Sequence, residues 1–299
     1  MRKQGFLGAL SLFVAAFIWG TAFVAQDAGM DYIEPFTFQA VRSFIGSLFL
    51  LLIIYIRDSF KKNKPQLYEE TKPDKKATYK GGIYCGIVLT VAACFQQFGI
   101  KYSTVGKAGF ITALYVIFVP LCSLFFGKKV RPIIFVSAFL GTIGLYMLCM
   151  AESFSLSLGD TLLLICAFSY TAHIIVIDKF SPKADCIKLS CIQFFVAGVL
   201  ATILMFIFEK PDVFAILKAT GPLLYTGVLS SGIAYTLQII GQKHTEPAVA
   251  SLMMSLESVF AVLAGAVVLH QIPTFYETLG CFILFAAIII AQIPSKKKV

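Results

Sequence analysis

The chain has 299 residues, of which 58% are apolar and only 14% are charged, and its mean hydropathy is +0.84. Soluble domains are about 45–50% apolar and about 25% charged, so this composition excludes an ordinary soluble protein and indicates a polytopic membrane protein. The net charge of +9 does not indicate a nucleic-acid partner, because the Lys and Arg residues lie between the apolar runs, as the positive-inside rule expects.

Ten apolar runs predict an all-α membrane protein with ten transmembrane helices. About 20 residues at 1.5 Å each span a hydrocarbon core of about 30 Å, whereas barrel strands would be about ten residues long and alternating. The predicted spans are residues 7–25, 35–56, 81–100, 108–126, 132–151, 158–177, 188–208, 221–241, 247–269 and 276–293.

Trp19, the only Trp, lies midway through the first predicted span. Twelve residues into a span is too deep for the membrane interface, where Trp is usually found. Its indole N–H needs a partner when buried, and its ring can stack on a planar or cationic substrate. We predict that Trp19 lines a substrate cavity, with simple packing between helices as the alternative.

Arg42 in the second span lies seven residues after Pro35, about 10 Å from the outer end of the helix. Three roles are open. Its side chain can snorkel to the surface, pair with an acid such as Asp31 or Glu34, or face the cavity and anchor a substrate carboxylate.

The connecting segments predict the orientation of the chain. Of the 25 Lys and Arg residues, 20 lie on the side that holds both termini, and eight of these are in the loop at 57–80. This bias predicts a protein of the cell membrane whose N- and C-termini are cytoplasmic. The loop at 57–80 also has four acids, and we interpret it as a solvated linker without a domain of its own.

Polar side chains in the middle spans are further candidates for substrate binding. Gln96 in the third span and Gln238 in the eighth need hydrogen-bond partners inside lipid, so they either contact substrate or tie helices together. Tyr115, Tyr170 and Tyr235 each offer a hydroxyl on an apolar body, which suits an amphipathic substrate, although a Tyr in a span often only packs.

His173 in the sixth span is a candidate for proton transfer, because a histidine titrates near neutral pH. A purely structural role is the alternative.

Glu257 is the one ionisable side chain in the ninth predicted span, at 247–269. It lies ten residues from Pro247, about 15 Å along the helix and near the middle of the bilayer. A carboxylate there costs about 2.5–3.5 kcal/mol on insertion scales, so it should face a polar cavity or a partner. We predict that Glu257 binds substrate or carries a coupling proton, with a buried structural acid as the alternative.

An internal repeat divides the chain into two units, 1–151 and 152–299. Trp19 corresponds to Tyr170 at an offset of 151 residues. At an offset of 142 residues, the set Gln96, Gly99, Lys101, Leu114 and Phe118 recurs as Gln238, Gly241, Lys243, Leu256 and Phe260. Each unit has five spans, and because five is odd, the second unit enters the membrane from the opposite side. Such inverted repeats are typical of carriers with alternating access to a central site.

Catalytic and cofactor motifs are missing. The sequence has no Walker-type phosphate loop, no His-Glu-x-x-His and no Gly-x-Ser-x-Gly, and its eight Cys include no Cys-x-x-Cys pair. We therefore expect no enzyme activity, no cofactor and no bound metal, and we expect an ion gradient to drive transport.

Several segments resemble carriers of the EamA type in the drug/metabolite transporter superfamily. They are AFIWGT at 16–21, GFITAL at 109–114, SGIAYTLQ at 231–238, GQKHTEP at 241–247 and SLESVF at 255–260. The resemblance implies a ten-helix carrier with a central cavity lined by spans one, three, four, six, eight and nine. Members move amino acids, other metabolites or toxic organic compounds, mostly outward.

The chain departs from that pattern in two respects. Many members have a Gly-Glu pair at the ends of spans four and nine, but this chain has Gly127-Lys128 and His270-Gln271, so the usual ion pair is expected to be absent. Tyr115 also stands at the position that Glu257 has in the other half, so the cavity is expected to be electrically asymmetric.

The sequence thus predicts a secondary transporter that exports small amphipathic metabolites such as amino acids or amines. The expected partners are a small-molecule substrate, the lipid bilayer and a proton; a homodimer is left open. The alternatives are an intramembrane enzyme acting on lipid and a non-transporting partner subunit of a lipid-modifying complex.

Overall fold

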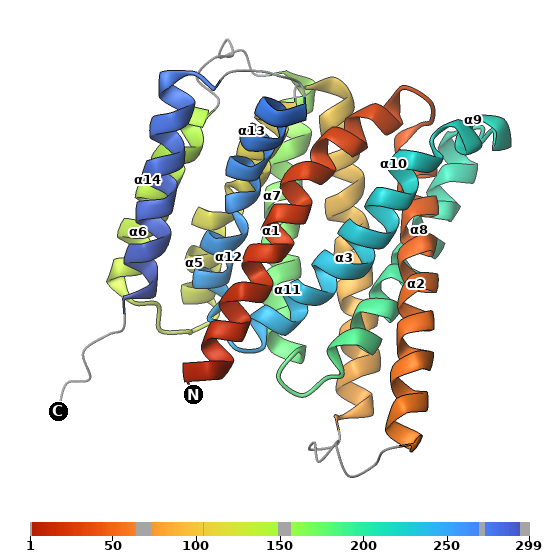
Figure 1. Ribbon diagram of the computed structural model, residues 1–299, viewed down its shortest axis with the longest axis horizontal. Helices are drawn as coiled ribbons and strands as arrows, with labels where there is room; N and C mark the ends of the chain where they lie inside the picture. Colours follow the sequence, from red (N-terminus) through yellow and green to blue (C-terminus); the bar gives the residue numbers. More distant parts are fainter. Residues whose placement is uncertain (1, 64–72, 104, 149–156, 269–272, 294–299) are drawn as a thin grey trace.

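A computed structural model describes residues 2–63, 73–103, 105–148, 157–268 and 273–293. In this part of the chain all ten predicted spans are helical (Figure 1). Among the described residues, nine helical segments are long and apolar enough to cross a membrane, and Pro132–Leu148 is a shorter tenth. The spans are α1 (Arg2–Met30), α2 (Pro35–Asn63), α3 (Lys75–Tyr102), α4 with α5 (Val105–Ala113, Tyr115–Phe125), α6 (Pro132–Leu148), α7 (Leu158–Phe180), α8 (Cys186–Phe208), α10 with η2 and α11 (Thr220–Leu224, Tyr225–Ala234, Tyr235–Gln242), α12 with α13 (Pro247–Met254, Leu256–Val268) and α14 (Phe275–Gln292). A short helix, α9 (Val213–Lys218), precedes the eighth span.

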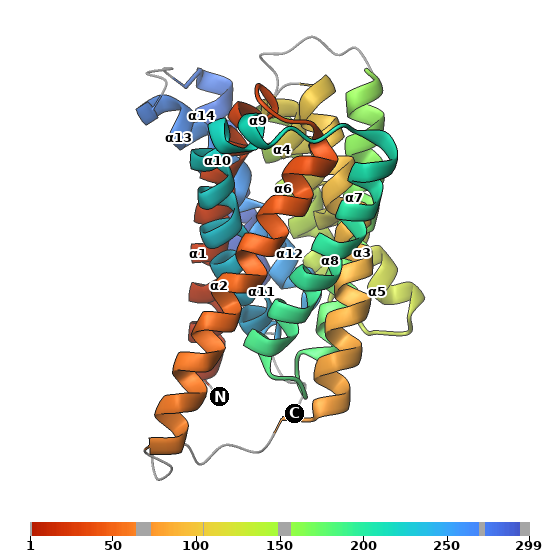
Figure 2. The ribbon, with the colours of Figure 1, turned by 90° about the vertical axis from the view of Figure 1, so that its right-hand side faces the viewer.

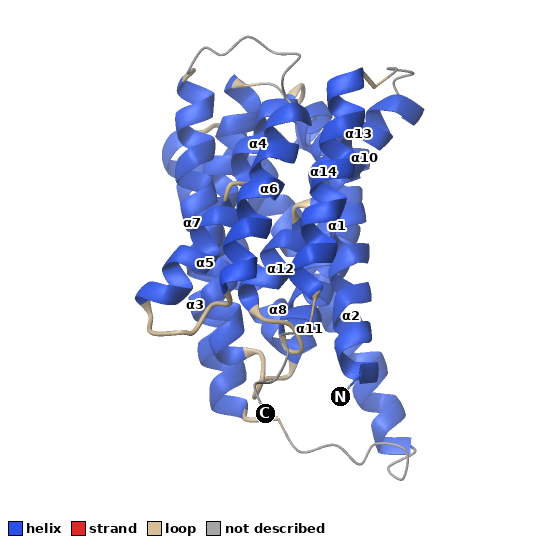
Figure 3. Ribbon diagram, turned by 90° about the vertical axis from the view of Figure 1, so that its left-hand side faces the viewer, coloured by secondary structure: helices blue, strands red, loops and turns tan. Residues whose placement is uncertain are grey.

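The start of α1 and the end of α14 lie on the same side of the bundle, as an even number of crossings requires (Figures 1, 2 and 3). We call this side the terminal face and the other the opposite face. The predicted boundary between the two repeats, at residues 151 and 152, lies outside the described residues.

Matching spans of the two repeats pack against each other. The fifth and tenth spans, α6 and α14, form a pair at one edge of the bundle (Figure 1). A Cβ added to Gly144 would lie 2.8 Å from the carbonyl oxygen of Gly280, and a Cβ added to Gly280 would lie 2.6 Å from that of Gly144. The two backbones are therefore in contact, which small residues permit in lipid.

The second and seventh spans, α2 and α8, are joined at both ends. On the opposite face, the carboxylate of Glu209 at the end of α8 accepts hydrogen bonds from the backbone N–H groups of Phe36 and Thr37, at 2.7 and 2.8 Å. On the terminal face, Arg57 of α2 donates two bonds of 2.9 and 2.8 Å to Asp185, the N-cap of α8. Each helix start is thus stabilised by an acid at the place where its unpaired N–H groups favour negative charge.

Spans four and nine are interrupted at mid-depth, which the apolar runs did not predict. The interruptions are at Leu114 and Ser255, whose backbone angles are nearly the same: φ −60° and ψ −11°, and φ −64° and ψ −10°. Both turns are tighter than an α-helix, because each contains a hydrogen bond to the carbonyl oxygen three residues earlier. The Ile117 N–H donates to the Leu114 carbonyl at 3.0 Å, and the Ser258 N–H donates to the Ser255 carbonyl at 3.2 Å. Irregular backbone is tolerated here because it faces protein, and it brings Tyr115 and Glu257 to the centre of the bundle.

Candidate functional site

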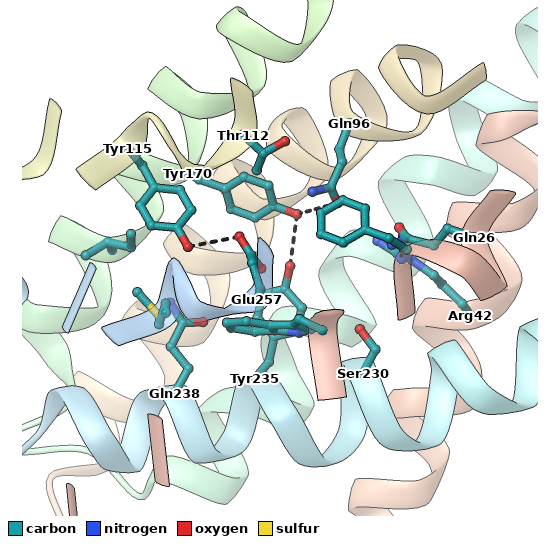
Figure 4. A pocket seen from close by; sticks show the side chains of 14 residues that line it. Gln26, Arg42, Gln96, Thr112, Tyr115, Tyr170, Ser230, Tyr235, Gln238 and Glu257 are labelled. Carbon is teal, nitrogen blue, oxygen red and sulfur yellow. Dashed lines mark hydrogen bonds between the residues drawn. The ribbon is translucent and has the colours of Figure 1, made fainter. Parts of the chain in front are cut away.

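A cavity lies at the centre of the bundle, between helices of both repeats (Figure 4). All seven residues predicted to bind substrate line it, and so does Arg42. The full lining is Trp19, Phe23, Gln26, Arg42, Gln96, Thr112, Tyr115, Tyr170, Ile174, Ser230, Tyr235, Gln238, Met254 and Glu257. About 40 Å³ is open to the centres of water molecules. One water needs about 10–15 Å³ by this measure, so the cavity holds only a few waters and must widen to admit a substrate.

Glu257 lies in the first turn of α13, directly after Leu256, and is 5% exposed. Its Oε1 accepts a hydrogen bond of 3.0 Å from the hydroxyl of Tyr115. The close approach of α1 helps to bury it, because a Cβ on Gly20 would lie only 2.5 Å from the carbonyl oxygen of Glu257. The acid therefore faces the cavity beside a phenol, and no ion pair between described residues includes it.

Tyr170 and Tyr235 form the centre of a hydrogen-bond chain. The hydroxyl of Tyr170 lies 3.0 Å from Gln96 Oε1 and 3.0 Å from the hydroxyl of Tyr235. Because an amide oxygen only accepts, Tyr170 donates to Gln96 and accepts from Tyr235. Trp19 packs edge-on against Tyr235, with ring centroids 4.8 Å apart. The aromatic side chains thus hold one another in place and form one wall.

Polar atoms without a partner also line this cavity. Within the described residues they are the indole Nε1 of Trp19, Oε1 of Gln238 and Oγ1 of Thr112. Buried polar groups are usually hydrogen-bonded, so a ligand in the cavity would supply partners that the indole N–H of Trp19 and the amide oxygen of Gln238 lack.

Arg42 is only 3% exposed, so of the three roles left open, snorkelling to the surface is wrong. Its Nε donates to Gln39 Oε1 at 2.7 Å and its Nη1 to Gln26 Oε1 at 2.8 Å. Pairing with Asp31 or Glu34 is also wrong, because no ion pair between described residues includes Arg42. Two neutral amides orient the guanidinium without cancelling its charge.

His173 does not line the cavity. It is fully buried behind the side chains that line the cavity, and its Nε2 lies 3.1 Å from Gln193 Oε1. Its ring packs edge-on against that of Tyr235, with ring centroids 5.9 Å apart. A proton on His173 would therefore reach the cavity through Tyr235 or Tyr170 and not directly.

Several residues that line the cavity are not among those predicted from the sequence. Gln26 follows the first apolar run, which ends at residue 25, but α1 continues to Met30. Thr112 and Ser230 are small polar residues of the kind found throughout the spans, so nothing in the sequence distinguishes them. Within the described residues, no three His, Cys, Asp or Glu side chains are grouped so that they could hold a metal ion.

The sequence has Gly127-Lys128 where many family members have Gly-Glu, and the structure shows what Lys128 contacts. Lys128 forms an ion pair with Asp178 at the end of α7, in the other repeat. This pair has a cation at the position where many members have a Glu, so it is a different contact from the one that the sequence predicts to be absent. His270-Gln271 lies outside the described residues.

Two inverted repeats of five spans around a buried polar cavity define a membrane transporter. The EamA-like transporter family matches the chain twice, at residues 6–150 and 157–292, and the chain belongs to this family. The predicted family and the ten-helix fold are thus confirmed.

Similar proteins agree with this assignment. An uncharacterized transporter of Archaeoglobus fulgidus is 31% identical over 286 residues, which are 95% of this chain and 85% of that protein. The uncharacterized transporter YoaV of Bacillus subtilis is 24% identical over 93% of this chain and 94% of its own. One crystal structure shares the fold, with a TM-score of 0.77 and 19% identity over 95% of this chain and 96% of that one.

Proposed function

We propose that this protein is a secondary active transporter that exports small amphipathic amino acids or related amines by alternating access through the central cavity. The observation that supports the proposal is that one cavity presents both a guanidinium, Arg42, and a carboxylate, Glu257 (Figure 4). Neither takes part in an ion pair with another described residue.

A zwitterion fits this arrangement. Its carboxylate would bind Arg42, which amides already orient, and its ammonium group would bind Glu257 beside Tyr115. Leaving either charge alone in a low-dielectric site is costly, so a ligand that compensates both is favoured. Trp19 and Tyr235 would contact the apolar part of the ligand.

Coupling to a proton gradient completes the proposal. Glu257 is the group that would bind either the ammonium group or a proton, and His173 would assist through the Tyr170–Tyr235 pair. The terminal face would lie in the cytoplasm, since 20 of the 25 Lys and Arg residues lie in its segments.

Uptake into proteoliposomes tests the proposal. We expect the wild type to take up tritiated L-leucine faster than isoamylamine, which has the same carbon chain without the carboxylate. Arg42→Gln should remove this preference, whereas a change of an exposed cation on the opposite face, Lys218→Gln, should keep it. Wild-type uptake of neither compound, nor of any other amino acid, would overturn the proposal.

The intramembrane enzyme is tested in parallel. Purified protein incubated with lipid substrates should leave them unchanged, because Glu257 has no second acid or His beside it among the residues that line the cavity. Turnover of lipid without uptake would favour the enzyme, and neither activity would favour a partner subunit.

A further inference from the structure

A second hollow opens on the terminal face, at the ends of helices that also line the central cavity. Its walls include Ser123 of α5, Asp178 of α7, Gln242 of α11 and Pro247 of α12. About 390 Å³ of it is open to the centres of water molecules. We call this hollow the vestibule.

The same four helices line both spaces. On α11, Gln238 lines the cavity and Gln242, one turn nearer the terminal face, lines the vestibule. On α5, Tyr115 and Ser123 are two turns apart, and the fully buried Val119 lies between them. The vestibule and the cavity are therefore separated by about one layer of side chains.

Gln242, which lines the vestibule, carries a buried acceptor oxygen without a hydrogen-bond partner among the described residues. Its Nε2 donates to the backbone carbonyl of Ile174 at 3.0 Å, and because a carbonyl can only accept, the orientation of the amide is fixed. Its Oε1 is then left without a partner, although the residue is only 3% exposed. The hydroxyl of Ser123, also 3% exposed, is likewise unpartnered among the described atoms.

Charged side chains of both signs surround the vestibule. The exposed Lys129, Lys243 and Glu246 lie at its rim, while Asp178, paired with Lys128, lies at the end of α7. From the end of α7 inward, Asp178, Gln242, Gln238 and Glu257 form a series of acceptor oxygens. A zwitterion that approaches from the terminal face would meet charges of both signs at the rim, which can attract its two ends, and acceptor oxygens further in.

We propose that the vestibule is a second substrate site, in which Gln242 Oε1 accepts a hydrogen bond from the ammonium group of a zwitterionic amine before the amine passes to Gln238 and Glu257. The site would act on the terminal side only. This inference rests on the proposed function, because it assumes that such compounds are transported.

The test measures uptake of tritiated L-leucine in proteoliposomes whose terminal face is outward. Gln242→Leu removes the acceptor, and we expect it to raise the KM about tenfold, as loss of a hydrogen bond to a charged group does, with the maximal rate within about twofold of wild type. Gln242→Glu also loses the Nε2 bond to Ile174 but keeps an acceptor and adds a negative charge, so its KM should stay well below that of Gln242→Leu. Gln292→Leu makes the same change at an exposed position of the terminal face outside the vestibule and should have no effect.

Thermal unfolding shows whether each variant is folded, and the KM for uptake from the opposite face should be unchanged in Gln242→Leu. An unchanged KM in folded Gln242→Leu, with active wild type, overturns the vestibule site alone. An equal rise in KM on both faces also overturns it, because the loss would then lie in the central cavity. If wild type moves no amino acid, the proposed function fails and this inference fails with it.

Discussion

Tyr115 and Glu257 stand 142 residues apart at equivalent positions of the two repeats, and their side chains meet at the centre of the bundle, where the Tyr115 hydroxyl donates to Glu257 Oε1 at 3.0 Å. The pseudo-symmetry of the repeats thus brings two chemically different residues together on the axis that relates them. Because one partner is a phenol and the other an acid, the pair has one negative charge at most near neutral pH, and that charge belongs to Glu257.

Removing that charge should stop transport without unfolding the protein. Glu257→Gln keeps the size of the side chain and can still accept from Tyr115, but it can neither carry a proton nor pair with an ammonium group. We expect proton-coupled uptake of L-leucine to fall by at least about tenfold, since an intramembrane acid is costly and is kept for function.

Tyr115→Phe is the matched variant, because it removes the hydrogen bond and leaves the charge. It should reduce uptake less than Glu257→Gln does. Uptake by Glu257→Gln at the wild-type rate, with an unchanged melting temperature, would exclude Glu257 from the mechanism.

The contact of α1 with α13 should depend on Gly20. A Cβ at this position would lie 2.5 Å from the backbone oxygen of Glu257 and 2.5 Å from Cβ of Phe260, so Gly20→Ala must push the two helices apart. We expect a loss of about 1–3 kcal/mol in stability, as in other overpacked interiors, and a lower thermal midpoint in detergent.

Gly5→Ala, on the same helix, is the control, because nothing lies within 4 Å of the added Cβ. It should leave the midpoint unchanged or raise it, since Ala favours a helix more than Gly does. Equal midpoints for the two variants would show that α1 and α13 are not in close contact at Gly20.

The sequence predicted the spans well because hydropathy is a local property that each helix shows along its own length. It did not predict the interruptions at Leu114 and Ser255, because residues typical of helices surround both and the tightened turns depend on packing. The partners of Arg42 were missed for a related reason: Gln26 and Gln39 are neutral, and one of them lies on another helix. Depth in the membrane can be estimated from the sequence, but contacts between helices cannot.

The hydrogen-bonded ion pair between Arg57 and Asp185 should make the stability of the packed helices α2 and α8 depend on pH. Burial on its own raises the pKa of the Asp185 carboxyl, but the hydrogen bonds from Arg57 and from the backbone N–H of Lys188 outweigh it and hold the pKa below its ordinary value of 3.8. A carboxyl with a lowered pKa in the folded state contributes its full stability above the unfolded value and loses it as the pH falls through the folded value.

We therefore expect the thermal midpoint of the wild type to fall between about pH 5 and about pH 3 more steeply than that of Asp185→Asn. Asp212→Asn, which changes an exposed N-cap on the other face, should keep the wild-type slope. Parallel curves for wild type and Asp185→Asn would contradict the assignment.

The ion pair between Lys128 and Asp178 joins the two repeats at the rim of the vestibule, so a change in either partner should be corrected by the complementary change in the other. Lys128→Asp and Asp178→Lys each place like charges together, and the double exchange restores an opposite pair. Lys128 is 47% exposed, and such pairs contribute only about 0.2–1 kcal/mol, so the single variants should fold. If the pair holds the repeats together on the terminal face, each single variant will change the rate of L-leucine uptake from that face and the double variant will recover it. Additive effects of the two single changes would instead show that the residues act independently and that the contact has no part in transport.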